Sequence, residues 1–270
     1  MTARFLCVGT HHKTGTVWMR RTFHKFAESE GIPVIRVNRK TRAADLPATN
    51  PALIVNWSSE FSRSLFDHPD ARFLHMIRDP RDVLLSGYRY HLTAPTGNEK
   101  FLRIPRPDLG GLTYKEHLNS RPDLVSGLLF EMEGKHAETL AEMLAWPYGH
   151  PHVVDLRYED MIDDTDCALF RAALARMDVA GFDAERLTGF YWTHSLFGGL
   201  ADRSNRKANV TKHVRSGKSE QWRSKLPREV AEIYAERFGS ALGLLGYALT
   251  DDWVDACPLA ADMAAGALTG

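Results

Sequence analysis

Short apolar segments that alternate with helical patterns constrain this chain more than any other feature. The first reads FLCV at residues 5–8, and similar segments follow at residues 34–37, 52–56, 72–77 and 152–156. Each has the length and the β-branched or aromatic content of a buried strand. Strands that are separated by helices usually pair in parallel. We therefore expect an α/β fold, with a central parallel β-sheet flanked by helices on both faces.

The first apolar segment runs into a glycine-bearing bend that suits an anion. Gly9 is followed by the polar residues THHKTGT, and a helical pattern then continues to Gly31. A strand, a loop and a helix in this order direct backbone N–H groups and the positive end of the helix toward one point. Lys13 would add a mobile cation there, and Thr14 and Thr16 would add hydroxyl donors.

This bend does not match the most familiar phosphate loop. That pattern, G-x-x-x-x-G-K-[ST], places the lysine after its second glycine, whereas Lys13 precedes Gly15. Taken alone, the bend could therefore also be an ordinary structural turn.

A second charged motif follows the fourth apolar segment. Asp79 can cap a helix whose first residue is Pro80. Arg78 then stands at the end of the strand, where a guanidinium can hold an anion through two hydrogen bonds. Ser86 falls two turns into the helix. The alternative is that Arg78 only pairs with Asp82 and that Ser86 faces solvent.

The later chain predicts further helices and loops. We expect a long loop at residues 93–111, a helix at residues 122–146 that breaks near Gly134, and a last helix that begins at Pro227. Residues 197–222 are rich in glycine, serine and basic side chains. Such a segment is either a solvated face or a lid that closes over an anionic ligand.

The chain shows no internal repeat and no long linker. We therefore expect a single domain over residues 1–250 and a C-terminal tail at residues 251–270, packed or partly disordered. A chain of 270 residues with 44% hydrophobic residues can bury one substantial core.

Composition excludes several classes of protein. Lys+Arg and Asp+Glu both number 34, so the basic excess typical of a nucleic-acid binder is missing. The three cysteines, Cys7, Cys167 and Cys257, are far apart and show no metal-ligand spacing, which favours a reducing compartment. The chain has no signal-peptide pattern, and no apolar stretch approaches the ~18 residues of a membrane span. We expect a soluble, cytoplasmic protein without a metal site, whose oligomeric state stays open.

Four motifs in this order resemble the sulfotransferases that use 3′-phosphoadenosine 5′-phosphosulfate (PAPS), which have a P-loop-like nucleotide-binding architecture. The bend matches the family's 5′-phosphosulfate loop K-[ST]-G-[ST]-x-W, and the second motif matches its 3′-phosphate site R-[DN]-P-[RK]-D-V-x-x-S-x-Y. A Tyr-Glu-Asp after a strand and a lid similar to R-K-G-x-x-G-D-W complete the set. The matching segments are residues 13–18, 78–88, 158–160 and 215–222.

The resemblance implies how the donor is held. The cofactor-binding residues would be Lys13, Thr14, Gly15, Thr16, Val17, Trp18, Arg78, Ser86, Tyr158, Phe197, Arg215, Ser216 and Gly217. Of these, Arg78, Ser86 and Arg215 would hold the 3′-phosphate, while Tyr158 and Phe197 would approach the adenine. The lid departs from the family pattern because it lacks the second basic residue and the Gly-Asp pair; Lys218 could replace the missing lysine.

The same resemblance implies the reaction. A sulfuryl group would pass from PAPS to a hydroxyl or amine of a small-molecule, carbohydrate or lipid-linked acceptor, with Lys13 as a catalytic residue at the leaving phosphate oxygen and with adenosine 3′,5′-bisphosphate (PAP) as the product. The histidine base of the cytosolic members is missing from the matching region, residues 56–60. Carbohydrate-modifying relatives can use a glutamate, so Glu60 is the first candidate, followed by His91 and His12.

Two other functions stay open from the sequence. One is a P-loop kinase or another nucleoside-triphosphate enzyme, which the position of Lys13 disfavours. The other is a catalytically inert nucleotide-binding protein of the same fold, which the altered lid permits.

Overall fold

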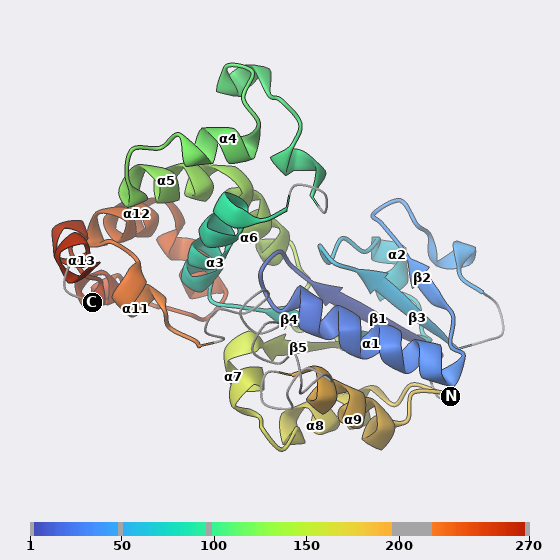
Figure 1. The fold of residues 1–270 in the computed structure, drawn as a ribbon. Coiled ribbons are helices and arrows are strands. Elements are labelled where there is room, and N and C mark those ends of the chain that lie inside the picture. The colour runs from blue at the N-terminus through green and yellow to red at the C-terminus, as the bar shows by residue number, and fades with distance from the viewer. Residues whose placement is uncertain (1–2, 48–50, 96–98, 196–217, 268–270) are drawn as a thin grey trace. The chain divides into compact units, whose positions relative to one another are not determined.

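The chain divides into two compact units in a computed structural model that describes residues 3–47, 51–95, 99–195 and 218–267. The sheet unit comprises Met1–Arg78 and Ala145–Lys218, and the helical unit comprises Asp79–Leu144 and Ser219–Gly270 (Figure 1). Each unit has its own hydrophobic core.

The sheet unit is built on a five-stranded parallel sheet with the order β2-β3-β1-β4-β5 (Figure 1). The expected strands are confirmed, with ends that differ by no more than two residues. The strands are β1 (Phe5–Thr10), β2 (Val34–Arg36), β3 (Ala52–Asn56), β4 (Ala71–Ile77) and β5 (Val153–Arg157). The central strand β1 is buried at every position, as is expected where both faces of a parallel sheet are covered.

Helices lie on both faces of this sheet, as predicted. On one face, Val8 and Met76 pack with Phe23 of α1 and with residues of α8 and α9. On the other face, Cys7 packs with Phe66 of α2 and with Trp146. The helices of the unit are α1 (Thr16–Glu30), α2 (Arg63–Phe66), α7 (Tyr158–Asp163), α8 (Ala168–Met177) and α9 (Ala184–His194), with a 3-10 turn η1 (Ala43–Asp45).

The helical unit packs around α3 and α12. Leu84 and Leu85 of α3 share a core with Tyr234 of α12 and with Trp222. Its helices are α3 (Pro80–Thr93), α4 (Tyr114–Asn119), α5 (Leu124–Glu131), α6 (Ala137–Leu144), α11 (Trp222–Lys225), α12 (Arg228–Leu244) and α13 (Ala260–Ala267), with short turns η2 (Lys100–Leu102), η3 (Pro107–Leu109) and η5 (Asp252–Ala256). The predicted long loop at residues 93–111 thus contains two such turns.

The helix predicted at residues 122–146 is broken at Gly134, as expected. Gly134 has φ −93° and ψ −118° inside the π-helical turn η4 (Met132–His136), which joins α5 to α6. A Cβ at this position would lie 2.6 Å from the hydroxyl oxygen of Tyr114. The glycine therefore allows the kink and also leaves room for a buried tyrosine.

The prediction that Pro227 begins the last helix is wrong. Pro227 caps α12, but η5 and α13 follow it. Within residues 251–257, Trp253 and Cys257 are buried in the core of the helical unit. Among the described residues, no helix is both long enough and apolar enough to cross a membrane.

Candidate functional site

Four predicted site residues follow four different strands of the sheet. Lys13 comes after β1, Glu60 after β3, Arg78 after β4, and Tyr158 directly after β5. Because the strands are parallel, all four residues leave from the carboxyl edge of the sheet, where ligands bind in open α/β folds. The sequence prediction therefore converges on one edge of the sheet unit.

The loop between β1 and α1 folds around the backbone of His11. The Thr14 Oγ1 accepts a hydrogen bond from the His11 N–H at 2.9 Å and lies 3.0 Å from the His11 carbonyl oxygen and 3.1 Å from that of Met76. The Thr16 hydroxyl donates to the His11 carbonyl at 2.7 Å and contacts Thr10 Oγ1 at 2.9 Å. Both threonine hydroxyls, which the sequence assigned to a phosphate, thus also shape the loop.

Two left-handed residues give the loop its sharp bend. Lys13 has φ +65° and Gly15 has φ +101°, a region that costs little only for glycine. A Cβ on Gly15 would lie 2.7 Å from Met76 Sδ and 3.3 Å from the ring of Tyr158. Gly15 is thus required twice, once for its backbone angle and once because side chains approach it closely.

The helix after the loop points its N-terminal turn at the same edge of the sheet. Gly15 is the N-cap of α1, so the first backbone N–H groups of this helix are directed toward the loop. Trp18, the last residue of the matching motif, stacks on Tyr191 at 4.4 Å and donates its indole N–H to the Tyr191 carbonyl at 3.2 Å. Its ring therefore fastens α1 to α9, while Val17 is 37% exposed.

Arg78 joins the loop to the residue after β5. Its Nη1 donates to the Lys13 carbonyl at 3.3 Å, and its guanidinium lies 4.4 Å from the centre of the Tyr158 ring. Both side chains are buried, at 6% exposure each. Three of the four sequence motifs therefore meet through direct contacts, which the order of the motifs along the chain did not specify.

The first turn of α3 has the cap that the sequence predicted. The Asp79 side chain accepts a hydrogen bond from the backbone N–H of Arg81 at 2.9 Å, and Pro80 occupies the first helical position. Asp82 accepts from the Trp222 backbone N–H at 3.0 Å. Ser86 lies half-buried on the same helix.

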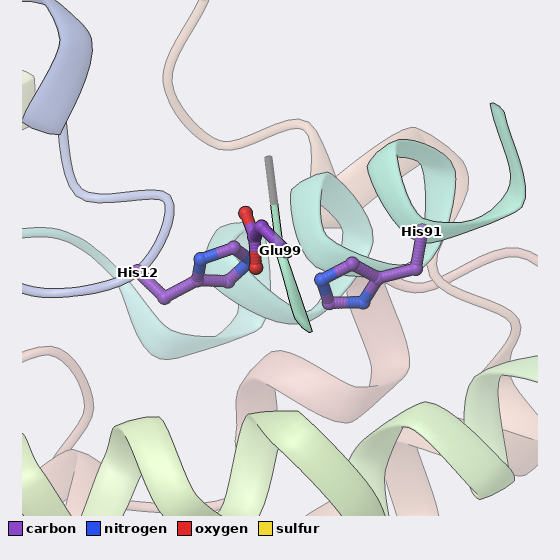
Figure 2. A group of neighbouring side chains, drawn as sticks. All are labelled: His12, His91 and Glu99. Carbon is purple, nitrogen blue, oxygen red and sulfur yellow. The ribbon is translucent and has the colours of Figure 1, made fainter. Parts of the chain in front are cut away.

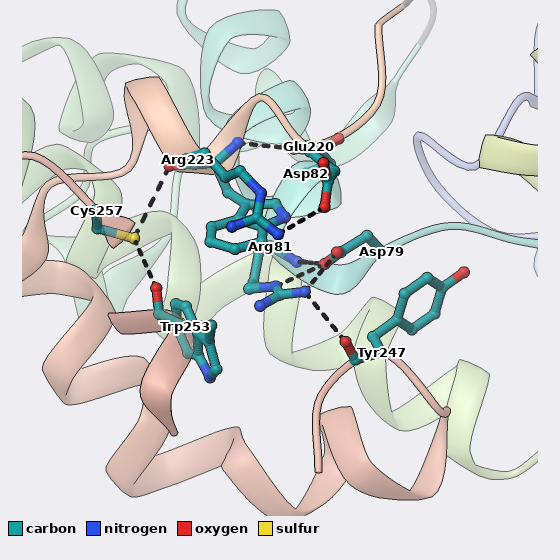
Figure 3. Close-up of polar contacts among 9 residues, drawn as sticks. Asp79, Arg81, Asp82, Glu220, Arg223, Tyr247, Trp253 and Cys257 are labelled. Atoms are coloured by element: carbon teal, nitrogen blue, oxygen red, sulfur yellow. Dashed lines mark hydrogen bonds and ion pairs between the residues drawn. The ribbon is translucent and has the colours of Figure 1, made fainter. Parts of the chain in front are cut away.

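Arg81 is the buried centre of this turn, and sequence reasoning gave it no role (Figure 3). Its guanidinium pairs with both carboxylate oxygens of Asp79, at 3.0 and 2.7 Å, and lies 3.9 Å from the Trp222 ring and 4.8 Å from the Trp253 ring. Cys257 Sγ is 3.9 Å from the backbone oxygens of both tryptophans. The chain after residue 250 thus supports the first turn of α3.

The three candidate bases have different surroundings. The Glu60 backbone is fixed by Asn56, whose Nδ2 donates to the Glu60 carbonyl at 3.1 Å. The Glu60 side chain pairs through Oε1 with Arg39 at 2.6 Å. His91 is fully buried on α3 and bonds Glu131 through Nδ1 at 2.8 Å; the same carboxylate accepts from the Tyr114 hydroxyl.

An acidic side chain of the same unit, Glu99, also lies close to His91. Ligand atoms of His91 and Glu99 lie within 4.8 Å of each other (Figure 2). His12, which Figure 2 also labels, is half-buried and belongs to the loop of the sheet unit. Of the remaining predicted site residues, Phe197, Arg215, Ser216 and Gly217 lie outside the described residues, and Lys218 is exposed.

Comparison with known proteins identifies the class that this sheet and loop define. A family model described as a sulfotransferase domain matches residues 5–246, most of the chain. The chain belongs to the sulfotransferase family. The family and the fold class inferred from the sequence are therefore both confirmed. A search of curated protein sequences gave no match.

Solved structures agree on the fold. A mouse sulfotransferase, SULT7A1, complexed with PAP, aligns with a TM-score of 0.55 at 13% identity, covering 90% of this chain and 88% of that one. A retinol dehydratase in complex with androsterone and inactive cofactor PAP aligns with a TM-score of 0.52 at 14% identity, covering 90% and 81%. At this identity the likeness concerns the fold.

Proposed function

We propose that the protein transfers a sulfuryl group from PAPS to a hydroxyl or amine of a small-molecule, carbohydrate or lipid-linked acceptor. The observation that carries the proposal is the contact of Arg78 with the Lys13 carbonyl and the Tyr158 ring. It joins the residues expected at the 5′-phosphosulfate, the 3′-phosphate and the adenine. The structurally similar sulfotransferase and dehydratase were both solved with PAP, which supports the same nucleotide here.

The loop supplies the groups that sulfuryl transfer requires. Transfer needs in-line positioning of the reacting atoms and stabilisation of the negative charge that grows on the leaving phosphate oxygen. Lys13 and Gly15 have left-handed backbone angles directly before the N-terminal turn of α1. Lys13 would stabilise or protonate the leaving oxygen, and the N–H groups of residues 14–17 would hold the phosphosulfate.

The residues after β4 and β5 would bind the rest of the nucleotide. Arg78 and Ser86 would hold the 3′-phosphate, together with Arg215, and this phosphate distinguishes the donor from a nucleoside triphosphate. Tyr158 would contact the adenine, together with Phe197. Because Arg78 and Tyr158 are largely buried and contact each other, they form a preorganised anion-binding edge.

We propose Glu60 as the base that activates the acceptor, with His91 and His12 as the competitors. Support for Glu60 comes from its position on the carboxyl edge and from the Asn56 amide that fixes its backbone. His91 has an orienting carboxylate, Glu131, but is fully buried. Geometry decides such a role before pKa does.

Paired variants separate the base candidates. If Glu60 is the base, Glu60→Gln removes the acidic limb of the pH–rate profile because the titrating group is gone, whereas His91→Gln keeps that limb. Unchanged activity and an unchanged profile in Glu60→Gln would exclude Glu60.

The acceptor class and the location are the least constrained parts of the proposal. A retinol dehydratase of this fold was solved with retinol and with androsterone, both small hydroxyl-bearing molecules, which supports the small-molecule class.

We also propose a cytoplasmic location, supported by three buried cysteine thiols that form no disulfide.

A transfer assay with radiolabelled PAPS and a panel of alcohols, sugars and amines tests the function. Wild type should label at least one class, and Lys13→Ala should lower the rate by ~10²–10³ or more because it removes a group at the developing charge. Lys25→Ala is the matched control, since Lys25 is an exposed lysine of α1 that pairs with Glu28. Near-normal transfer by Lys13→Ala would contradict the role given to Lys13.

A further inference from the structure

A buried histidine pair lies directly beneath the loop that carries Lys13. The Nε2 atoms of His11 and His75 are 2.8 Å apart, and both side chains are fully buried. His75 is on β4, in register with Asp155 on β5. Its Nδ1 lies 2.8 Å from the Asp155 Oδ1, and its ring stacks on Trp146 at 3.9 Å.

The hydrogen bonds fix the direction in which the histidines donate. A carboxylate can only accept, so His75 donates its Nδ1–H to Asp155. A neutral His75 then presents an Nε2 lone pair, and the His11 Nε2–H donates to it. Trp146 Nε1–H also donates to Asp155 Oδ1 at 2.8 Å. Asp155 thereby holds His75 in one tautomer, and His75 holds the His11 ring.

The backbone of His11 is the hub of the loop. Its N–H donates to Thr14 Oγ1, and its carbonyl accepts from the Thr16 hydroxyl and from the Thr14 N–H. Lys13 lies between His11 and Thr14, and its backbone angle is left-handed. Because His75 holds the His11 ring, it also restrains the loop backbone that carries Lys13.

Buried polar side chains such as His11, His75 and Asp155 are a costly way to fill a protein core. Two imidazoles and a carboxylate need hydrogen-bond partners when they leave water, whereas apolar residues of similar volume would fill the same space without that requirement. The neighbouring positions of β4 on the same face, such as Phe73, are apolar. The polar set begins near the carboxyl end of β1, where His75 is in register with Gly9, and its contact with His11 joins it to the loop.

We propose that His75, oriented by Asp155, is a positioning residue for the phosphosulfate loop and sets the affinity for the PAPS and PAP nucleotide through His11. This inference rests on the proposed function, because the affected ligand is the nucleotide assigned there. His75 acts through His11 and does not touch the donor.

Two substitutions of His75 each keep one of its two hydrogen bonds and remove the other. In His75→Gln, the amide oxygen takes the place of Nε2 and still accepts from His11, while the bond to Asp155 is lost. In His75→Asn, the amide nitrogen takes the place of Nδ1 and still donates to Asp155, while His11 loses its partner. Calorimetry with PAP should show roughly tenfold weaker binding for His75→Asn and a smaller loss for His75→Gln.

Two further variants serve as controls. His136→Gln changes another buried histidine, which pairs with the Tyr234 hydroxyl at 2.9 Å in the helical unit; it should lower the unfolding temperature without weakening PAP binding. Asp155→Ala, at a side chain that is 28% exposed, should fold even if both His75 variants do not, and should weaken PAP binding several-fold.

The outcomes separate this inference from the proposed function. No PAP binding by the wild type would overturn the proposed function. Wild-type binding with equal affinities in His75→Asn, His75→Gln and Asp155→Ala would overturn the positioning role alone. Weaker binding by His75→Asn than by His75→Gln, at similar unfolding temperatures, would support it. If neither His75 variant folds, the affinity of Asp155→Ala decides between the last two results.

Discussion

The loop after β1 and the first turn of α3 both match phosphate motifs, yet they are stabilised in different ways. The loop of the sheet unit is held by backbone hydrogen bonds around His11 and by buried polar groups on adjacent strands. The turn of the helical unit is held by Arg81, which pairs with Asp79 and packs on Trp222 and Trp253.

The two motifs are therefore sensitive to different changes. The loop depends on backbone angles and close approach, so a single methyl group can disrupt it. The turn depends on one buried charge and on aromatic rings from the end of the chain, so it is sensitive to residues far from the motif in sequence.

Gly15→Ala should abolish PAP binding. The new methyl group would meet Met76 Sδ at 2.7 Å and would force a left-handed angle on alanine, so the loop that carries Lys13 must shift. Gly31→Ala is the matched control, because Gly31 also has a left-handed angle, φ +67°, but its Cβ would meet nothing within 4 Å. It should lower the unfolding temperature slightly and keep PAP binding. Equal calorimetric affinities for both variants would contradict the steric role of Gly15.

Arg81→Met should destabilise the protein by about 3–5 kcal/mol, since it removes the guanidinium that pairs with the buried Asp79 carboxylate. Urea denaturation measures this change. Arg237→Met removes an exposed ion pair with Glu133 in the same unit and should change the free energy of unfolding very little.

Trp253→Leu should lower the free energy of unfolding by an amount between those of Arg81→Met and Arg237→Met, because it removes a ring beside Arg81 but leaves the Arg81–Asp79 ion pair. A Trp253→Leu protein as stable as wild type would show that the chain after residue 250 does not support this turn.

The buried His75 also predicts how stability depends on pH. Burial lowers the pKa of His75 to about 4, although its bond to Asp155 opposes the shift. The unfolded chain binds this proton near pH 6.5, so the stability from a neutral His75 is present above that pH and is lost as the pH falls toward about 4. Thermal unfolding between pH 7 and pH 4.5 should therefore decline less steeply for His75→Gln than for wild type. Parallel curves would contradict a buried, neutral His75.

The sequence predicted what depends on neighbours along the chain. The strands, the bend at Gly15, the Asp79 cap and the break at Gly134 follow from local propensity and backbone geometry, and the structure contains all of them. The family motifs also pointed to the carboxyl edge, where the structure places Lys13.

Contacts between distant segments could not be predicted in this way. The stacking of Arg78 on Tyr158 and the pairing of His75 with Asp155 depend on strand register, which motifs do not encode. The sequence allowed the tail after residue 250 to be packed or partly disordered, and it did not predict that Trp253 lies beside Arg81. The single domain over residues 1–250 stays a prediction.

Calorimetry that compares PAP with ATP plus magnesium tests whether this protein binds the PAPS nucleotide. If the loop before α1 and Arg78 form a PAPS site, PAP should bind more tightly than ATP with magnesium, and Arg78→Ala should reduce that preference by weakening PAP selectively. The claim would be contradicted if ATP with magnesium bound more tightly than PAP, or if PAP did not bind to the folded wild-type protein.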